Sequence, residues 1–282
     1  IKNNLQFTMS ELHEMIDKER ATSVFGFPYL KHRLNFYQLM DQVKTEAIQT
    51  RPLNSGGTLF IMHDDNTSQI TRAFQEHAIL HTKITTKGKI LDSFWEAWYK
   101  NKQLQRTIRQ SSDPVEEMWK QSYTHKYKLA TTFMPAYAKA IYEHFNANIV
   151  IDPCSGWGDR LLGALATSCV ETYIGFDPNK NLRPGYADIV ALARRIRPSR
   201  VTDEIMEFGT TATIYSTPFE NTISCIPNES ADLIFTSPPF FDYEIYCLDN
   251  PMYTDWISEF YVPLFQESER VCKKNGHVVI YV

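Results

Sequence analysis

Apolar positions divide the chain into two halves with different patterns. In the first half, apolar residues recur at spacings of three and four, which predicts helices. The recurring residues are Leu12, Met15 and Ile16 in one stretch and Leu30, Leu34, Tyr37 and Met40 in the next. A third helix is expected over residues 90–108, and turn residues at 51–57 predict a loop ahead of a short strand at 58–62. Residues 1–125 are therefore predicted to form a mostly helical N-terminal region.

The second half alternates short β-rich apolar runs with helical stretches. Strands are expected at residues 148–151, 172–176, 211–215, 232–235 and 277–282, and helices at 160–166, 186–195 and 253–272. This rhythm predicts an α/β domain with a mainly parallel sheet over residues 126–282. The Ser-Ser-Asp-Pro run at 111–114 predicts a boundary or a helix start ahead of that domain. Because ligands of such sheets bind beyond the carboxyl ends of the strands, the residues that follow each run are the candidates for chemistry.

The composition is that of an ordinary globular protein. Of the 282 residues, 43% are hydrophobic and 22% are charged, and no window approaches the ~18 apolar residues of a membrane span. The five cysteines are an odd number without a CxxC pair, so neither a disulfide framework nor a zinc site is predicted. The cytoplasm or another reducing intracellular compartment is the expected location, with a nuclear or virus-associated location as the alternative.

The charge of the two halves differs in sign. Residues 1–130 hold 18 Lys and Arg against 14 Asp and Glu, whereas residues 131–282 hold 11 against 19. Only the first half has the sign expected of a surface that meets a polyanion, although an excess of this size is more often found on a simply solvated surface. The basic residues that would contribute are Lys83, Lys87, Lys89, Lys100, Lys102, Arg106 and Arg109.

A glycine loop follows the first predicted strand of the second half, with the sequence Asp152-Pro-Cys-Ser-Gly156-Trp-Gly158. Two glycines let the backbone come close to a ligand. A dinucleotide fingerprint would need a third glycine where Leu161 stands, and a pyrophosphate would not favour Asp152 at the start of its loop. The loop therefore disfavours NAD and favours a cofactor with a positively charged amino group. Alone, the two glycines are as typical of a tight turn that binds nothing.

An acidic residue ends the second predicted strand, in the pair Asp177-Pro178. Asp177 comes 19 residues after Gly158, about where a ribose-binding carboxylate belongs in a nucleoside-binding βαβ unit. A strand-terminal Asp before Pro is by itself more often a turn residue. Combined with the glycine loop at this spacing, it predicts a contact with ribose hydroxyls.

The most specific motif is Ser237-Pro238-Pro239-Phe240, which directly follows the apolar strand that ends at Thr236. Consecutive prolines fix φ and remove two N–H donors, so the turn presents acceptors in a rigid array. The serine hydroxyl and the neighbouring carbonyls suit the hydrogens of a flat exocyclic amine, and Phe240 offers a face for a stacked base. A bare Ser-Pro-Pro would more often be only a rigid turn.

In this order and on these strand ends, the three motifs resemble those of class I nucleic-acid amino-methyltransferases, which use S-adenosyl-L-methionine (SAM). The resemblance covers about residues 129–282 and implies a Rossmann-like methyltransferase domain. It implies cofactor-binding roles for Phe133, Asp152, Cys154, Gly156, Gly158, Asp177, Pro178, Thr217 and Phe219. It implies catalytic roles for Ser237, Pro238, Pro239 and Phe240, and no metal. The longer string from Ser237 to Tyr246 also resembles phage and large-virus methyltransferases.

The resemblance further implies the substrate. Within the family, a serine before the two prolines is typical of enzymes acting on cytosine N4, whereas Asn or Asp is typical of adenine N6 and of glutamine methylation. Methylation of cytosine N4 in DNA is therefore the leading expectation, with adenine N6 or an RNA base as the alternative. A non-catalytic partner subunit that binds nucleic acid is the alternative of another class.

Two departures from the family bear on the boundaries of the chain. The family's sheet continues past the strand at 277–282 into a final hairpin, so the chain is expected to be a fragment. No target-recognition domain follows the catalytic motif, so residues 1–125 are expected to supply substrate binding.

Overall fold

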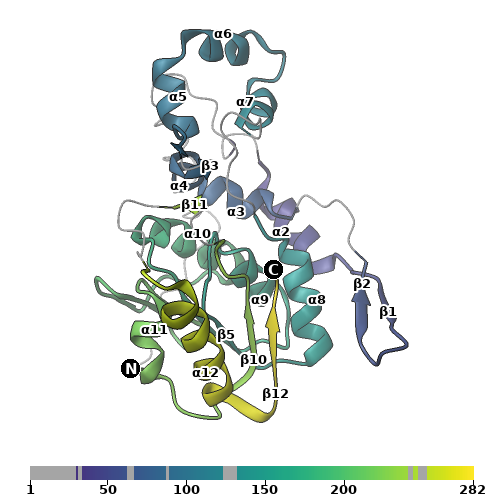
Figure 1. Ribbon diagram of the computed structural model, residues 1–282. Coiled ribbons are helices and arrows are strands. Elements are labelled where there is room, and N and C mark those ends of the chain that lie inside the picture. The colour runs from purple at the N-terminus through teal and green to yellow at the C-terminus, as the bar shows by residue number, and fades with distance from the viewer. Residues whose placement is uncertain are drawn as a thin grey trace.

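A parallel sheet forms the centre of the molecule, as the sequence predicts. The computed structural model describes residues 30, 34–61, 67–86, 89–122, 132–240, 244–246 and 253–282 (Figure 1). Within these residues, seven strands pair in the order β12-β10-β5-β6-β9-β8-β7. They are β5 (Ile149–Asp152), β6 (Thr172–Phe176), β7 (Arg200–Val201), β8 (Ile205–Phe208), β9 (Ala212–Tyr215), β10 (Ala231–Thr236) and β12 (Cys272–Ile280). The pairings among β12, β10, β5, β6 and β9 are parallel, and those of β8 and β7 are antiparallel.

Alternating side chains of the central strands build two hydrophobic layers, one on each face of the sheet. On β10, Leu233 and Phe235 belong to one buried cluster and Ile234 belongs to the other. β5 divides in the same way between Val150 and Ile151. Successive side chains of a strand point to opposite faces, so a strand covered on both faces reads as a continuous apolar run. These runs are the signal that made the strands predictable.

Helices cover both faces of the sheet (Figure 1). The first layer consists of α8 (Pro135–Phe145), α9 (Asp159–Ala166) and α10 (Arg183–Arg194), in which α9 contacts both neighbours. The second consists of α11 (Phe219–Thr222), a π-helical turn (Ile257–Tyr261) and α12 (Val262–Val271). α8 and α9 pack so closely that a Cβ on Gly163 would lie 2.6 Å from the carbonyl oxygen of Pro135. Only glycine fits there.

The first N-terminal helices pack directly on this layer. They are α2 (Phe36–Thr45), which contacts α8, α9 and α10, and α3 (Gln69–Phe74), which contacts α10, while α4 (Glu76–His81) packs against α3. The buried Lys139 ammonium on α8 donates hydrogen bonds of 2.7 and 2.8 Å to the carbonyl oxygens of Lys44 and Glu46, and so satisfies the end of α2. Phe36 of α2 also belongs to the same buried cluster as the sheet residue Leu233. The domain boundary predicted at residue 125 lies outside the described residues.

Three further helices rise above the sheet in Figure 1: α5 (Phe94–Lys100), α6 (Lys102–Gln110) and α7 (Pro114–Ser122). The prediction of one helix over 90–108 is wrong in its extent. Ser93 begins α5 with a capping box, and Asn101 ends it and caps α6 by accepting 3.0 Å bonds from two backbone N–H groups. The helix start predicted at 111–114 is confirmed by α7.

A small sheet joins the two halves of the chain. In it, β3 (Lys83–Thr86) pairs antiparallel with β4 (Lys89–Ile90) on one side and with β11 (Glu244–Ile245) on the other. β11 comes shortly after the Ser-Pro-Pro-Phe motif, so the segment behind that motif is held by the N-terminal half. The sequence did not predict this pairing, because strands of two and four residues carry too little alternation to recognise.

Other boundaries differ from the predictions in detail. The strand predicted at 58–62 is confirmed as β2 (Thr58–Phe60), but part of the predicted loop at 51–57 is its partner β1 (Thr50–Pro52). The helix predicted from residue 253 begins with the π-helical turn at Ile257, and the last strand begins earlier, at Cys272. The helix predicted around Leu12 and Met15 lies outside the described residues. None of the helices in the described part of the chain is long and apolar enough to cross a bilayer.

Candidate active site

The predicted motifs meet at the point where the strand order reverses. From β5 the chain proceeds to β6 on one side and returns later to β10 on the other side of β5. A crevice forms outside the carboxyl ends of the strands at such a switch point, because the two connections leave in opposite directions. The glycine loop follows β5, Asp177 follows β6, and the Ser-Pro-Pro-Phe turn follows β10. All three motifs therefore lie at one edge of the sheet.

Two hydrogen bonds tie the three motifs together. The backbone N–H of Cys154 in the glycine loop donates to Thr236 Oγ1, at the end of β10, over 3.1 Å. The backbone N–H of Gly156 donates to Asp177 Oδ2, at the end of β6, over 2.9 Å. The loop is therefore anchored on both sides. Its conformation depends on Thr236, which precedes the Ser-Pro-Pro-Phe turn, and on Asp177, which follows β6.

The two glycines of the loop have backbone conformations that other residues rarely adopt. φ is 54° at Gly156 and 90° at Gly158. A Cβ on Gly158 would also lie 2.8 Å from Cδ1 of Ile189 on α10. The Tyr186 hydroxyl, from the same helix, donates a 2.5 Å hydrogen bond to the carbonyl oxygen of Gly156. α10 therefore supports the loop from behind.

Asp177, a residue with part of its surface exposed, keeps acceptor capacity on its carboxylate. Its Oδ2 accepts from Gly156, and its Oδ1 accepts from the backbone N–H of Asn179 over 2.9 Å. An ionised carboxylate offers about four lone-pair positions, so each oxygen can accept one more hydrogen bond. Burial raises the pKa of Asp177 to about 7, and the two backbone bonds oppose this shift. The group therefore titrates near neutral pH.

Asp152 lies in a closed ion pair. Its carboxylate has no exposed surface and accepts hydrogen bonds from Arg160 Nε at 2.8 Å, from the Tyr173 hydroxyl at 2.7 Å and from the backbone N–H of Cys154 at 3.2 Å. All of these partners are groups of the protein. The proposed contact between Asp152 and a cofactor amino group stays a prediction, and the observed contacts fix the start of the loop. Arg160 is the counter-ion of Asp152, a role that the sequence alone did not indicate.

Phe133 is held beside the loop by a second buried carboxylate. Its backbone N–H donates to Asp159 Oδ2 over 3.2 Å, and Thr71 of the N-terminal helix α3 donates to the other oxygen of Asp159. Burial raises the pKa of Asp159 to about 7. The Phe133 ring packs edge-on against Phe235 and Tyr281, with centroids 5.6 and 5.2 Å away. Asp159 therefore connects α3 to the segment that is predicted to contact the cofactor.

An open cavity of about 570 Å³ lies beside the ends of β6 and β9 and contains two of the predicted cofactor residues, Pro178 and Thr217. Its other lining residues include Lys180, Glu220 and Tyr253, and the Tyr253 hydroxyl donates to Glu220 over 2.6 Å. Thr217 Oγ1 lies 2.6 Å from Thr222 Oγ1. Phe219 is only 2% exposed and packs in the core of the second layer, so its predicted role in cofactor binding stays a prediction.

The Ser-Pro-Pro-Phe turn points partly to the surface. Ser237 and Pro239 are partly exposed, Pro238 is buried, and Phe240 has 58% of its surface exposed. The Ser237 hydroxyl makes no hydrogen bond to any other residue in the described part of the chain. The turn therefore offers a hydroxyl and an aromatic face that a ligand can use.

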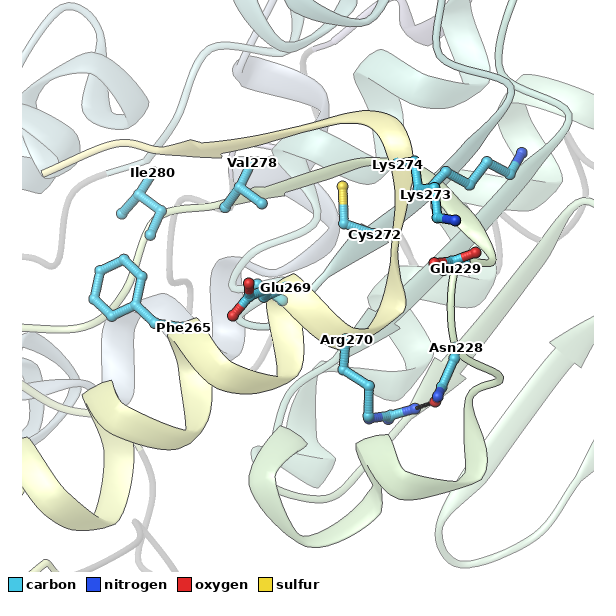
Figure 2. A pocket seen from close by; sticks show the side chains of 11 residues that line it. Asn228, Glu229, Phe265, Glu269, Arg270, Cys272, Lys273, Lys274, Val278 and Ile280 are labelled. Atoms are coloured by element: carbon cyan, nitrogen blue, oxygen red, sulfur yellow. Dashed lines mark hydrogen bonds between the residues drawn. The ribbon is translucent and has the colours of Figure 1, made fainter.

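A second open cavity, of about 1270 Å³, lies at the outer edge of the sheet (Figure 2). It is lined by residues of α12 and β12, such as Phe265, Lys273 and Val278, and by none of the predicted site residues. Figure 2 shows Arg270 joined to Asn228 at its rim. We place the candidate site at the switch point because the three motifs converge there.

The strand order defines the class of fold. A central β5 with β6 and β10 on either side, helices on both faces and an antiparallel pair at one edge make a Rossmann-like, methyltransferase-like α/β fold. Within the described residues, no group of three or more His, Cys, Asp and Glu side chains is placed to hold a metal ion.

Comparisons with known proteins give a similar solved structure. A solved structure of an O-methyltransferase family protein from Burkholderia thailandensis is similar at 11% identity and a TM-score of 0.34, covering 97% of this chain and 79% of that chain. No protein-family model and no curated protein matches the chain. The assignment of the fold therefore rests on the strand order of the chain itself.

Proposed function

We propose that the chain transfers a methyl group from SAM to the exocyclic amine of a nucleobase, with cytosine N4 in DNA as the favoured target. The observation that carries this proposal is the junction of the three motifs. Hydrogen bonds of 3.1 and 2.9 Å join the glycine loop to Thr236, ahead of the catalytic turn, and to Asp177. A cofactor beside Asp177 and a base beside Ser237 would then meet over the same loop.

The residues at the switch point fit the cofactor. Asp177 has an acceptor position left on each oxygen for the two ribose hydroxyls, and the cavity beyond Pro178 and Thr217 has room for the rest of a nucleoside. A Cβ on Gly156 would have only the Cys154 carbonyl oxygen within 4 Å, at 3.9 Å, so the loop backbone at Gly156 is open to close approach. When bound, SAM supplies an electrophilic methyl group on a sulfonium.

The turn suits an amine because of the acceptors that it presents. The lone pair of an exocyclic amine is delocalised into its ring. Acceptors at Ser237 Oγ and at the Ser237 or Pro238 carbonyl would bind both amine hydrogens, draw the nitrogen out of the ring plane and free the lone pair. Phe240 would hold the base by stacking after it has left the duplex. Correct orientation supplies much of the remaining rate enhancement.

The short side chain of Ser237 favours cytosine. Its hydroxyl lies close to the backbone, so the amine must approach nearer to the turn than it would beside the longer arm of Asn or Asp. A single pyrimidine ring fits this approach better than a purine. Adenine N6 remains the second choice, because its amine presents the same two hydrogens.

The N-terminal half supplies a basic surface for a polyanion. On α6, Lys102 and Arg106 are exposed, and the whole stretch from Lys100 to Gln110 contains four basic residues and no acidic residue. Leu104 and Ile108 bury the opposite face of the helix. Phosphates attract such a surface without regard to sequence, which would bring nucleic acid to the molecule.

Methyl transfer to separate polymers tests the proposal. The protein is incubated with radiolabelled SAM and, in parallel reactions, unmethylated DNA, RNA and protein, and the label is followed after digestion. Incorporation into DNA nucleosides is the expected result. Incorporation only into RNA would make RNA, and not DNA, the substrate. Incorporation only into protein would contradict the proposal. Calorimetric binding of SAM without transfer to any polymer would instead favour the non-catalytic subunit.

A further inference from the structure

Four aromatic rings form a row on the surface of the N-terminal half. His77 and His81 lie one turn apart on α4, with ring centroids 4.1 Å apart, and the His81 centroid lies 5.0 Å from that of Trp95 on α5. Trp95 in turn packs edge-on against Tyr99, one turn further along α5, with centroids 5.4 Å apart. We call His77, His81, Trp95 and Tyr99 the ring row.

The ring row is held firmly and yet reaches the solvent. Its two end members, His77 and Tyr99, are exposed, Tyr99 with 47% of its surface, and the other two are partly exposed. The neighbouring α5 residues Phe94 and Trp98 are buried in the core, which fixes this helix. Nδ1 of His81 hydrogen-bonds to the His77 carbonyl oxygen over 2.6 Å, which fixes the His81 ring. Rings that are already in place lose little freedom when a ligand binds to them.

The stretch of chain that contains Trp95 and Tyr99 has a large excess of positive charge. Residues 83–110 hold seven Lys and Arg against two acidic residues, a net charge of +5. The two acidic residues are each paired with one lysine, Glu96 with Lys83 at 2.8 Å and Asp92 with Lys100 at 3.0 Å. The excess therefore comes from the other basic residues, which include those of α6. A surface of this sign attracts the phosphates of a nucleic acid.

The ring row lies on the same side of the molecule as the candidate site. α4 leads into β3 through the single residue Thr82, and β3 pairs with β11, in which Glu244 lies opposite Ile84. β11 begins four residues after Phe240 in the sequence. In Figure 1, α4, β3 and β11 lie beyond the carboxyl ends of the central strands, and α5 rises from them. A strand bound at the candidate site can therefore extend toward the ring row.

Exposed rings beside an excess of positive charge suit a single strand of nucleic acid. Every base has a π-face that can stack on a Trp, Tyr or His ring, while basic side chains hold the phosphates of the same strand. Base pairing hides most of these faces in a duplex, which would use the charge alone. An enzyme that acts on a base outside the stack works on single-stranded DNA or opens the duplex, so unpaired bases occur next to its site.

We infer that the ring row is a stacking platform for unpaired bases of the DNA strand that enters the candidate site. The inference rests on the proposed function for the identity of the polymer. Binding to the ring row is independent of methyl transfer, and can be measured without SAM.

Four variants of the whole chain test the inference. Tyr99→Leu and the double variant Trp95→Leu, Tyr99→Leu remove rings but keep apolar bulk, and Tyr99→Phe keeps the ring. Phe265→Leu is the matched control, because Phe265 is a ring on α12 with 55% of its surface exposed and lies outside the ring row.

Fluorescence anisotropy measures the binding of four labelled probes at several salt concentrations. They are a DNA single strand of about 12 nucleotides, the same sequence as a duplex, the same strand with abasic sites in place of its bases, and the matching RNA strand. The abasic strand keeps the phosphates and lacks the faces that stack, so it separates the two contributions.

The expected results separate stacking from charge and from general destabilisation. The double variant should bind the DNA single strand at least ~10-fold more weakly, and Tyr99→Leu alone about threefold more weakly, because each lost ring removes a stacked base. The slope of log affinity against log salt should not change, since no phosphate contact is lost. Affinities for the duplex and for the abasic strand should stay within about twofold of wild type. Tyr99→Phe and Phe265→Leu should match wild type with every probe.

The inference and the proposed function fail in different ways. Wild-type affinity of the double variant for the DNA single strand, or an equal loss on the abasic strand, would overturn the stacking platform and leave the methyltransferase proposal intact. Tighter binding of the RNA strand would overturn the choice of DNA. If the double variant does not fold, Tyr99→Leu decides by the same comparison. A wild-type protein that methylates no polymer would contradict the proposed function, and the four probes would still decide whether the ring row binds bases.

Discussion

The glycine loop after β5 and the proline turn after β10 lie at the same edge of the sheet but are held in different ways. In the loop, the polar groups are bound by the protein: Asp177 and Thr236 accept its N–H groups, and Tyr186 donates to its carbonyl. In the turn, two prolines lack donors, and Phe240 is 58% exposed. The Ser237 hydroxyl makes no hydrogen bond within the described residues.

We propose that this difference corresponds to two kinds of ligand site. The loop has its shape fixed before any ligand arrives, which lowers the entropic cost of binding a cofactor. The turn keeps its acceptors and aromatic face available for groups that change during a reaction, which is where catalysis needs them. We therefore expect changes in the loop region to affect cofactor affinity and changes in the turn to affect turnover.

The largest effect should come from the turn. Ser237→Ala combined with Phe240→Ala removes one amine acceptor and the stacking face, so turnover should fall by at least ~10²-fold. Binding of SAM should remain within about twofold, because the proposed cofactor contacts lie in the loop and not in the turn. Single-turnover kinetics and calorimetric titration of the same preparation measure both quantities. Full-rate methyl transfer by the double variant would exclude the turn from the mechanism.

The next effect should come from the carboxylate beside the loop. Asp177→Ala removes the acceptor proposed for the ribose hydroxyls, worth roughly 1.5–3 kcal/mol, so SAM should bind about 10- to 100-fold more weakly. The variant also frees the N–H of Gly156, so its unfolding midpoint is measured alongside. Wild-type affinity in a folded Asp177→Ala protein would end the ribose assignment.

The pH dependence of binding should be smaller and should have a defined sign. Asp177 has a pKa of about 7 without ligand, and its ionised form is the better acceptor for hydroxyls, so binding should weaken as the pH falls through 7. Between pH 8 and pH 6 the dissociation constant should rise about tenfold. Titrations of Asp177→Asn should show little change over this range. A profile that persists in this variant would assign the titration to another group, such as Asp159, whose pKa is also about 7.

The smallest effects should come from single basic residues on α6. Lys102→Gln and Arg106→Gln should each weaken DNA binding a few-fold at low salt and flatten the slope of log affinity against log salt by about one unit. Lys83 serves as the internal comparison, since it is already paired with Glu96 at 2.8 Å. Binding isotherms at several salt concentrations measure the slopes. Unchanged slopes in the double variant would show that α6 is not the phosphate-binding surface.

The sequence predicts the central sheet well because its strands are buried on both faces. β6 has the predicted bounds, 172–176, and β10 extends the predicted run by one residue at each end. Such strands are marked by short apolar runs, and the motifs that follow them mark their carboxyl ends. The three motifs of the site could be recognised for the same reason.

The remaining features depend on contacts between distant parts of the chain. Nothing local indicates that Arg160 neutralises Asp152, because the pair forms only when α9 folds over the end of β5. The place of β11 likewise depends on a distant contact, because this strand is only two residues long and pairs with β3, more than 150 positions earlier in the chain. The local sequence pattern predicts the helices and strands, whereas these contacts depend on how distant elements pack together.

The most direct test of the account is the position of the transferred methyl group. Unmethylated DNA is incubated with the wild-type protein and SAM that carries a deuterated methyl group, then digested to nucleosides and analysed by mass spectrometry against N4-methylcytosine and N6-methyladenine standards. Deuterated N4-methylcytosine is the expected product of the wild-type protein, and the Ser237→Ala, Phe240→Ala variant is expected to lose it. Deuterium only on adenine N6 would reverse the choice of base, and deuterium on a ring carbon, a sugar or no nucleoside at all would contradict the proposed amine methylation.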